Sequence, residues 1–270
     1  MVAINQWEQA EDSMYTLCGK DRIHPSTDGH LVMAYLFLKA QGLAGKPVAD
    51  IRIDGAGKKV TRSDNCRVSD LSVSSDNLTF TYEAKSLPYP IDTSYYDNEK
   101  HTQADALSVI PFMDEMNYEG LSVSGLSDGY YGLTIGGEFI GRFTARELER
   151  GINMALLQNT PQYKQAMKIR QMNEERWLKE RKMREFYWVE YNLMRKTGML
   201  WACNEAAVDT LRKYRPHDIF LQWNGDLWLQ YMHKGIREDC VNEQQDLVNQ
   251  IYEQNKPIPL RIEIKKFTDL

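Results

Sequence analysis

The stretch that follows Pro161 contains no glycine or proline before Gly198, and it constrains the fold more than any other segment. Arg, Lys and Glu repeat there at helical spacings, and large apolar side chains such as Trp177 and Leu193 lie between them. This pattern predicts one long amphipathic helix with a solvated charged face, ended by Gly198. Because acidic residues are interspersed among the basic ones, this face is not expected to bind nucleic acid.

Short alternating runs replace this pattern between about Val48 and Gly141. They are separated by Gly, Asn, Asp and Pro, which predicts a set of antiparallel strands in a sandwich-like region. The clearest runs are VADIRID, RVSDLSVS, NLTFTYEA and YYGLTIGG. Residues 85–110 include Pro88 and Pro90, and they predict a long connection between strands.

Capping signals predict further helices outside this region. Thr144 and Glu147 have the spacing of a capping box. An apolar run from Leu31 predicts a helix that Gly42 ends. Residues 260–267 predict a terminal strand, so the chain as a whole is expected to be α+β.

The composition is that of an ordinary soluble protein, with 42% hydrophobic and 26% charged residues. A net charge of −5 supplies no general attraction to nucleic acid or to an anionic membrane. No apolar run is long enough to span a bilayer, and the first residues lack the pattern of a secretory signal. The compartment is left open, with a secreted or periplasmic parent protein as one option.

The cysteines and most histidines give no sign of a metal or another cofactor. Cysteines without metal-ligand spacing favour free, buried thiols, with one disulfide left open as an alternative. The cysteines are Cys18, Cys66, Cys203 and Cys240. No carboxylate or thiol stands at ligand spacing from His101, His217 or His233.

Asp21 and His24 stand three residues apart and are the main candidates for catalysis. A serine hydrolase needs a base that takes the hydroxyl proton and an acid that holds this base in the right tautomer. Within one turn of chain, the Asp21 carboxylate can reach Nδ1–H of His24 and leave Nε2 facing outward. Pro25 disfavours a helical conformation at His24, which places the imidazole at the mouth of the following helix. The alternative interpretation is that Asp21 caps a turn and His24 is a surface residue.

The wider segment from Asp21 to Ala34 resembles the final block of the SGNH (GDSL-type) ester hydrolases. The similarity rests on Asp21-Arg22-Ile23-His24-Pro25, then Asp28-Gly29-His30, then Met33-Ala34. A second stretch, about residues 117–190, is similar to the C-terminal region of a bacterial subgroup of that family, including a Gly-Ile-Asn helix start at Gly151 to Ala155. The resemblance implies that Asp21 and His24 are two members of a serine triad, and His30 is expected only to pack or hydrogen bond at the helix start.

The chain is expected to fall into three regions. The resemblance implies that residues 1–46 are the C-terminal end of an α/β, flavodoxin-like hydrolase core. The strand and helix patterns predict an antiparallel β-rich region at residues 47–142 and a mainly helical region at residues 143–270. The family's Gly-Asp-Ser nucleophile and oxyanion donors precede the Asp-x-x-His block, so the chain is expected to be N-terminally incomplete. Ser13 follows Asp12 without a preceding glycine or strand, and it is expected to be a polar residue at a helix end.

Three other features invite functional interpretations that the residues favour less. Residues 125–129, GLSDG, match a nucleophile elbow, but strand-like runs on both sides predict a hairpin turn instead. Asn153 is expected to be a structural residue rather than an oxyanion donor. Cross-strand packing is expected, with a sugar-stacking surface as the alternative, for Tyr95, Tyr96, Tyr130 and Tyr131.

Two functions from different classes follow. The first is a serine ester hydrolase that acts on a small acyl ester or an acetylated carbohydrate, with its nucleophile outside this chain. The second is a non-catalytic binding or interaction module that retains a hydrolase remnant. The helix from Leu31 would normally cover a parallel sheet, so Leu31, Leu36 and Phe37 are expected to face water unless C-terminal helices or a second copy cover them. A homo-oligomer is therefore an option.

Overall fold

The computed structural model describes residues 1–19, 21–94 and 101–267, so Tyr95 and Tyr96 lie outside the described residues. The chain is α+β, as the sequence predicts, and it forms two compact units. One unit comprises Met1–Met167 together with Lys256–Leu270, and the other comprises Lys168–Asn255. This division into compact units does not test the three regions expected with boundaries at residues 46 and 142, which stay a prediction.

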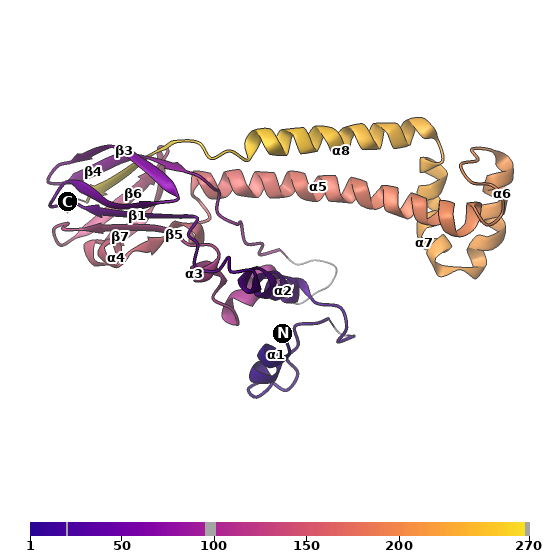
Figure 1. Cartoon of the computed structure of the whole chain (residues 1–270), viewed down its shortest axis with the longest axis horizontal. Coiled ribbons are helices and arrows are strands. Elements are labelled where there is room, and N and C mark those ends of the chain that lie inside the picture. The colour runs from indigo at the N-terminus through magenta and orange to yellow at the C-terminus, as the bar shows by residue number, and fades with distance from the viewer. Residues whose placement is uncertain (20, 95–100, 268–270) are drawn as a thin grey trace. The chain divides into compact units, whose positions relative to one another are not determined.

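Two sheets form the body of the first unit (Figure 1). In the four-stranded sheet, the order β2-β1-β5-β8 is formed by β1 (Ala49–Asp54), β2 (Lys59–Asp64), β5 (Glu119–Ser124) and β8 (Ile152–Asn153). In the five-stranded sheet, the order β3-β4-β9-β6-β7 is formed by β3 (Cys66–Val73), β4 (Asn77–Ala84), β6 (Tyr130–Ile135), β7 (Glu138–Thr144) and β9 (Leu260–Lys266).

Alternate residues of both sheets face a shared core, as a sandwich requires. Along β4 and β9, buried apolar residues alternate with more exposed ones. The fully buried members include Ile51, Phe80, Leu121, Ile135 and Ile262. The sandwich-like arrangement expected for the strand-rich region is therefore present.

The expectation that the strands are all antiparallel is wrong for one pair. β1 and β5 run parallel, in a register from Ala49 opposite Glu119 to Asp54 opposite Ser124. A parallel pair needs a long crossover, and residues 55–118 supply it through β2, β3, β4 and the predicted connection. Alternating hydrophobicity shows which side chains of a strand are buried. The pattern is the same for parallel and antiparallel strands, so the sequence could not predict the direction of this pair.

The terminal strand predicted at residues 260–267 is confirmed as β9. It pairs with β4 on one side and β6 on the other, both antiparallel, so it lies inside the five-stranded sheet. The last strand of the chain thereby completes the core of the first unit.

A second core of the first unit surrounds the helix predicted from Leu31, which is α2 (Thr27–Ala40). Leu31 and Tyr35 are buried against Ile91, Ala106 and Ile110, all from the long connection between β4 and β5. The connection contains η1 (Gln103–Ser108) and α3 (Phe112–Glu115), and α1 (Val2–Glu8) begins the chain. The expected cover by C-terminal helices or a second copy is thus wrong for Leu31, because this connection folds back over α2.

The other two apolar residues of α2 are less protected. Leu36 is half-buried against the same core, whereas the Phe37 side chain is 64% exposed. Beyond the helix, Gly42 adopts a positive φ of 74°, as a helix-ending glycine does.

The predicted capping box starts α4 (Ala145–Arg150) and is confirmed. Thr144 Oγ1 accepts from the backbone N–H of Glu147 at 3.1 Å, and Glu147 Oε2 accepts from the backbone N–H of Thr144 at 2.7 Å. The helix start expected at Gly151 to Ala155 is wrong, since β8 and one 3-10 turn, η2 (Met154–Leu156), occupy that position. Asn153 pairs there with Gly120 of β5, which draws the chain into the sheet.

The long helix predicted after Pro161 is confirmed as α5 (Pro161–Val189). It continues into a π-helical turn, η3 (Glu190–Met194), and Gly198 follows with a φ of 73°. The helical unit then adds α6 (Glu205–Tyr214), η4 (Arg215–His217), α7 (Ile219–Tyr231) and α8 (Lys234–Gln254). Its own core includes Phe186, Val189, Leu211 and Trp228.

Two further expectations concern cysteines and membranes. All four cysteines are free; Cys66 and Cys240 are buried, Cys18 is half-buried and Cys203 is exposed. Within residues 1–19, 21–94 and 101–267, no helix is both long and apolar enough to cross a membrane.

Candidate active site

Asp21 and His24 form the pair that the sequence predicts. Asp21 Oδ2 lies 2.6 Å from His24 Nδ1, while Asp21 Oδ1 accepts from the backbone N–H groups of Ile23 at 2.9 Å and His24 at 3.1 Å. The His24 side chain is 84% exposed. Asp21 thus also caps a turn and His24 lies at the surface, so the local geometry accommodates both a catalytic pair and a structural turn.

The hydrogen bond from His24, reinforced by the two backbone N–H groups, lowers the pKa of Asp21 to about 2. Asp21 is therefore ionised at neutral pH and holds the imidazole proton on Nδ1. Nε2 is then the ring nitrogen that can accept a proton from another group. The pair has the electronic arrangement that a general base requires.

A short closed loop holds this pair in front of α2. Cys18 and Pro25 form an isolated antiparallel bridge, and the Gly19 N–H donates to the His24 carbonyl at 2.7 Å. Within the loop, Arg22 adopts a φ of +56°, the left-handed region that a non-glycine residue enters at an energetic cost. The surrounding bonds therefore keep Asp21 and His24 on a constrained turn.

The base of the loop is fixed by the first turn of α2. The carbonyl of Leu17 accepts from both the backbone N–H and the hydroxyl of Ser26 at 3.2 Å. A Cβ on Gly29 would lie 2.0 Å from that same carbonyl oxygen, so only glycine permits the approach. The glycine of the Asp28-Gly29-His30 segment therefore has a local packing role.

Asp28 is a buried carboxylate that the sequence did not distinguish from a surface acid. It accepts from the Ser26 hydroxyl and from the Gly29 N–H, the latter at 2.7 Å. His101 Nδ1 lies 4.0 Å from its second oxygen, which is an ionic contact beyond hydrogen-bonding distance. A buried N-terminal acid of this kind stabilises the helix start through the helix dipole.

No serine named from the sequence meets His24 in the part of the chain that the structure describes. Ser13 lies in an exposed turn after α1, not at the helix end expected. The nearest serine in sequence, Ser26, is buried, and its hydroxyl donates to Leu17 and Asp28. The described residues thus bring the candidate base and the candidate acid together, with no assigned nucleophile beside them.

The GLSDG segment joins β5 to β6, which belong to different sheets, so the hairpin turn expected for it is wrong. A strand follows the segment, whereas a nucleophile elbow requires a helix. The Ser127 hydroxyl accepts from Lys266 Nζ at 2.8 Å and lies 3.1 Å from the Tyr131 hydroxyl. These contacts tie the connection to β9 and β6.

Asn153 has the structural role expected of it. Its Nδ2 donates to the carbonyls of Met113 at 3.0 Å and Asn117 at 3.2 Å. Its Oδ1 accepts from the N–H groups of Glu119 at 2.9 Å and Ala155 at 3.1 Å. All of these donors and acceptors serve the junction of β5 and β8, which leaves no amide proton for an oxyanion.

Of the four tyrosines considered in the sequence, Tyr130 and Tyr131 are described, and they differ in burial. Tyr131 is buried in the sandwich core, in line with packing. Tyr130 is 48% exposed, and the guanidinium of Arg142 lies 3.8 Å from its ring centroid. That face of the ring is therefore covered by a cation rather than open to a sugar.

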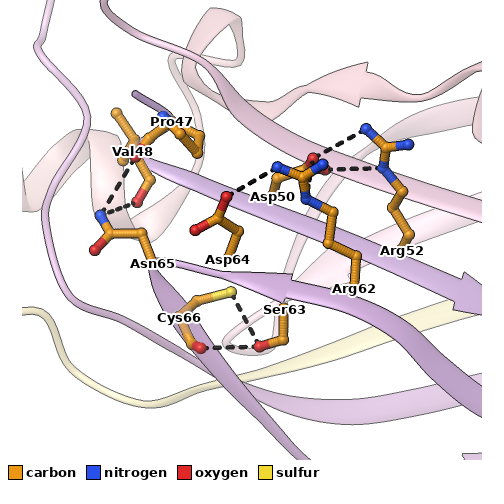
Figure 2. Close-up of polar contacts among 9 residues, drawn as sticks. All are labelled: Pro47, Val48, Asp50, Arg52, Arg62, Ser63, Asp64, Asn65 and Cys66. Carbon is orange, nitrogen blue, oxygen red and sulfur yellow. Dashed lines mark hydrogen bonds and ion pairs between the residues drawn. The ribbon is translucent and has the colours of Figure 1, made fainter. Parts of the chain in front are cut away.

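A second polar cluster lies on β1 and β2 (Figure 2). Asp50, whose side chain is only 6% exposed, accepts from Arg52 at 3.1 Å and from Arg62 at 2.9 Å. Arg62 also contacts Asp64 at 2.8 Å. Each charge in the cluster is paired with another charge of β1 or β2, so these ion pairs stabilise the register of the two strands. The cluster therefore contains no unpaired charged group that could act as a base.

Hydrogen bonds stabilise the turn between β2 and β3, next to this cluster. Asn65 adopts a φ of 53°, and its Nδ2 donates to the Val48 carbonyl at 2.8 Å (Figure 2). Cys66 Sγ lies 3.5 Å from the Ser63 hydroxyl, and burial raises the pKa of this thiol. No group of three metal-ligating side chains occurs among the described residues, so none of these clusters is a metal centre there.

Comparisons with known proteins point to one group of enzymes. The family model of the diltiazem deacetylase C-terminal helical domain matches residues 167–256, which are nearly the same as the compact helical unit Lys168–Asn255. A solved structure described as a gut microbial diltiazem-metabolizing enzyme is similar with a TM-score of 0.93 and 42% identity. The match covers 99% of this chain and 60% of that one, so the chain spans about three fifths of that relative's length. None of the curated proteins matches the chain.

These findings overturn the assignment to the SGNH (GDSL-type) hydrolases, which is wrong. The matching family model and the matching structure both concern diltiazem-metabolising proteins, and neither supports SGNH membership. The structure explains why the short block was misleading. Asp21 caps a turn, Pro25 forms a β-bridge with Cys18, and Gly29 leaves room for the Leu17 carbonyl. A tight turn before a helix therefore explains these three residues without any catalytic role.

Proposed function

We propose that this chain is part of an acyl ester hydrolase and carries the general base of its active site. The observation that carries the proposal is the 2.6 Å contact between Asp21 and His24 on an exposed, closed loop. The likeness to a diltiazem-metabolizing enzyme, and to a domain named after a deacetylase, supports an acetyl ester as the substrate class. An acetylated carbohydrate belongs to the same class.

In the proposed reaction, His24 Nε2 takes the proton of an enzyme hydroxyl as that oxygen attacks the acetyl carbonyl carbon. The imidazolium then gives this proton to the departing alcohol, and an acetyl-enzyme remains. Water repeats the sequence: His24 deprotonates it, the acetyl–oxygen bond breaks, and the proton returns to the enzyme hydroxyl as acetate leaves. Asp21 stabilises the imidazolium in both halves.

We further propose that the hydroxyl nucleophile belongs to a part of the enzyme outside these residues. The similar enzyme is longer than this chain, which spans 60% of it. The Ser26 hydroxyl is buried and bonded, and the Ser127 hydroxyl accepts from Lys266 in the sandwich. The exposed edge of His24 supports this arrangement, because a second segment can reach it.

The test is mutation of the pair in the complete enzyme, assayed with p-nitrophenyl acetate. His24→Gln should lower kcat/KM by about 10³-fold or more, and Asp21→Asn by about 10²- to 10⁴-fold, as in other serine triads. His30→Gln is the matched control, since His30 is an exposed histidine of α2 and should leave kcat/KM unchanged.

An unchanged kcat/KM in His24→Gln would overturn the role of the pair. Residues 1–270 assayed alone should show no hydrolysis beyond that of their own His24→Gln variant. Hydrolysis that depends on His24 in this chain alone would instead place the nucleophile within it. Complete inactivity of the whole protein towards acetyl esters would favour a non-catalytic binding or interaction module.

A further inference from the structure

The helical unit contains an exposed thiol beside an exposed imidazole. Cys203 Sγ lies 3.3 Å from His233 Nδ1, and both residues are exposed. Cys203 directly precedes Asn204, the residue that caps α6. His233 occupies the N-cap position of α8. The pair therefore joins the N-terminal ends of two helices that are thirty residues apart in the chain.

This contact has a chemical consequence for the thiol. A neutral imidazole nitrogen at hydrogen-bonding distance can accept the thiol proton, which gives a thiolate beside an imidazolium. An imidazolium beside it stabilises a thiolate by its charge. Because the thiolate is the nucleophilic form of cysteine, a base at this distance can activate the Cys203 thiol.

The other cysteines provide internal references. Cys240 is buried, and its Sγ donates to the Lys179 carbonyl at 3.6 Å. Cys66 is buried in the sandwich, where desolvation raises the pKa of its thiol. Cys18 is half-buried in the loop that carries the Asp21–His24 pair. Among the four thiols, the exposed one is also the one in contact with a histidine.

A metal site is a poorer explanation of the same pair. A structural zinc ion takes four protein ligands, and a catalytic one takes at least three. The described part of the chain contains no group of three potential ligands, so Cys203 and His233 lack the further ligands that a zinc site needs there. The pair is therefore better suited to thiol chemistry.

We propose that Cys203 and His233 form a nucleophilic thiol site that reacts with small disulfides by thiol–disulfide exchange. The Cys203 thiolate attacks one sulfur of the disulfide, a new S–S bond forms, and the original S–S bond breaks. The departing thiolate takes the proton from the His233 imidazolium. The products are a mixed disulfide at Cys203 and one free small thiol, and the small disulfide is the oxidant.

The test is the rate at which each cysteine of the intact protein reacts with 5,5′-dithiobis(2-nitrobenzoate), with peptide mass spectrometry assigning the label. At pH 7 Cys203 should react first, and His233→Gln should slow it about tenfold, because only a few per cent of an ordinary thiol is then ionised. Above about pH 9.5 the wild type and His233→Gln should react at similar rates, because an ordinary thiol is ionised there without help. Cys203→Ser should remove the fast phase.

Two controls keep the outcome decisive. His217→Gln changes another exposed histidine of the same unit and should leave the Cys203 rate unchanged. His233 makes no side-chain capping bond to α8, so its replacement should not unfold that helix, and circular dichroism checks this. Equal rates at pH 7 for wild type and His233→Gln would overturn the proposal. A tenfold difference that persisted above about pH 9.5 would also overturn it, since access rather than ionisation would then be the cause.

Discussion

At the scale of single residues, Glu119 shows how strongly burial in the sandwich changes the pKa of one side chain. It begins β5, is fully buried, and accepts from the Tyr82 hydroxyl at 2.8 Å and from Gln162 Nε2 at 3.2 Å. Both bonds go to one carboxylate oxygen, and the described residues supply no partner for the other. Burial raises the pKa of Glu119 to about 7, although the two hydrogen bonds oppose the shift.

This raised pKa predicts a pH-dependent stability. The folded protein holds the Glu119 proton more tightly than the unfolded chain, so its stabilising contribution is complete below the unfolded pKa of 4.5 and is lost as pH rises through about 7. The shift corresponds to about 3 kcal/mol. Urea unfolding of the wild type and of Glu119→Gln between pH 4 and pH 8 measures it. The wild type should lose stability relative to the variant across this range, and parallel pH profiles would contradict the assignment.

At the scale of elements, the start of α2 connects helix formation to the candidate site. Ser26 supplies the N-cap residue and Asp28 the acidic first turn, while the Leu17 carbonyl approaches Gly29 more closely than any side chain would allow. The loop that carries Asp21 and His24 is thereby joined to the helix. Sequence propensity alone would favour alanine over glycine in a helix, so the glycine has to be explained by packing.

Gly29→Ala should therefore destabilise the first unit by about 1–3 kcal/mol, because the new Cβ meets backbone that must move. Gly235→Ala is the matched control: Gly235 is also helical, and a Cβ there has nothing within 4 Å. The control should be neutral or slightly stabilising. Thermal unfolding measures both, and equal midpoints for the two variants would show that the loop yields without cost.

At the scale of the whole molecule, the chain has two separate principal cores around which its two units form. The sandwich core draws on β9 from the end of the chain, whereas the helical core uses only residues between Lys168 and Asn255. The helical unit is therefore an insertion into the first unit. Its limits nearly coincide with residues 167–256 of the deacetylase-domain match, which supports its status as a distinct module.

Separate cores predict separable effects of mutation. Ile262→Ala in β9 and Phe186→Ala in α5 each remove a fully buried side chain, and each should destabilise its own unit by about 2–5 kcal/mol. Hydrogen exchange of peptides from the two units measures this. Loss of protection should be confined to the unit that carries the substitution, and equal loss in both units after either change would mean that they unfold together.

Local physical chemistry decided which features the sequence could predict. The capping box at Thr144, the helix after Pro161 and the strand at residues 260–267 depend on interactions within a few residues, and all three are present. The contact between Asp21 and His24 belongs to the same class, since its partners stand three residues apart. The family assignment failed for the same reason. A short sequence block that resembles a family motif can arise because its residues form a particular turn, without common descent.

Tertiary structure decided the features that join distant segments. The parallel pairing of β1 with β5, the place of β9 inside its sheet and the cover over Leu31 all depend on packing between parts of the chain that periodicity does not relate. The burial of Glu119 and the contact of Cys203 with His233 have the same origin. Hydrophobic pattern specifies that a side chain is buried, whereas its partner is selected by the free energy of packing the whole unit.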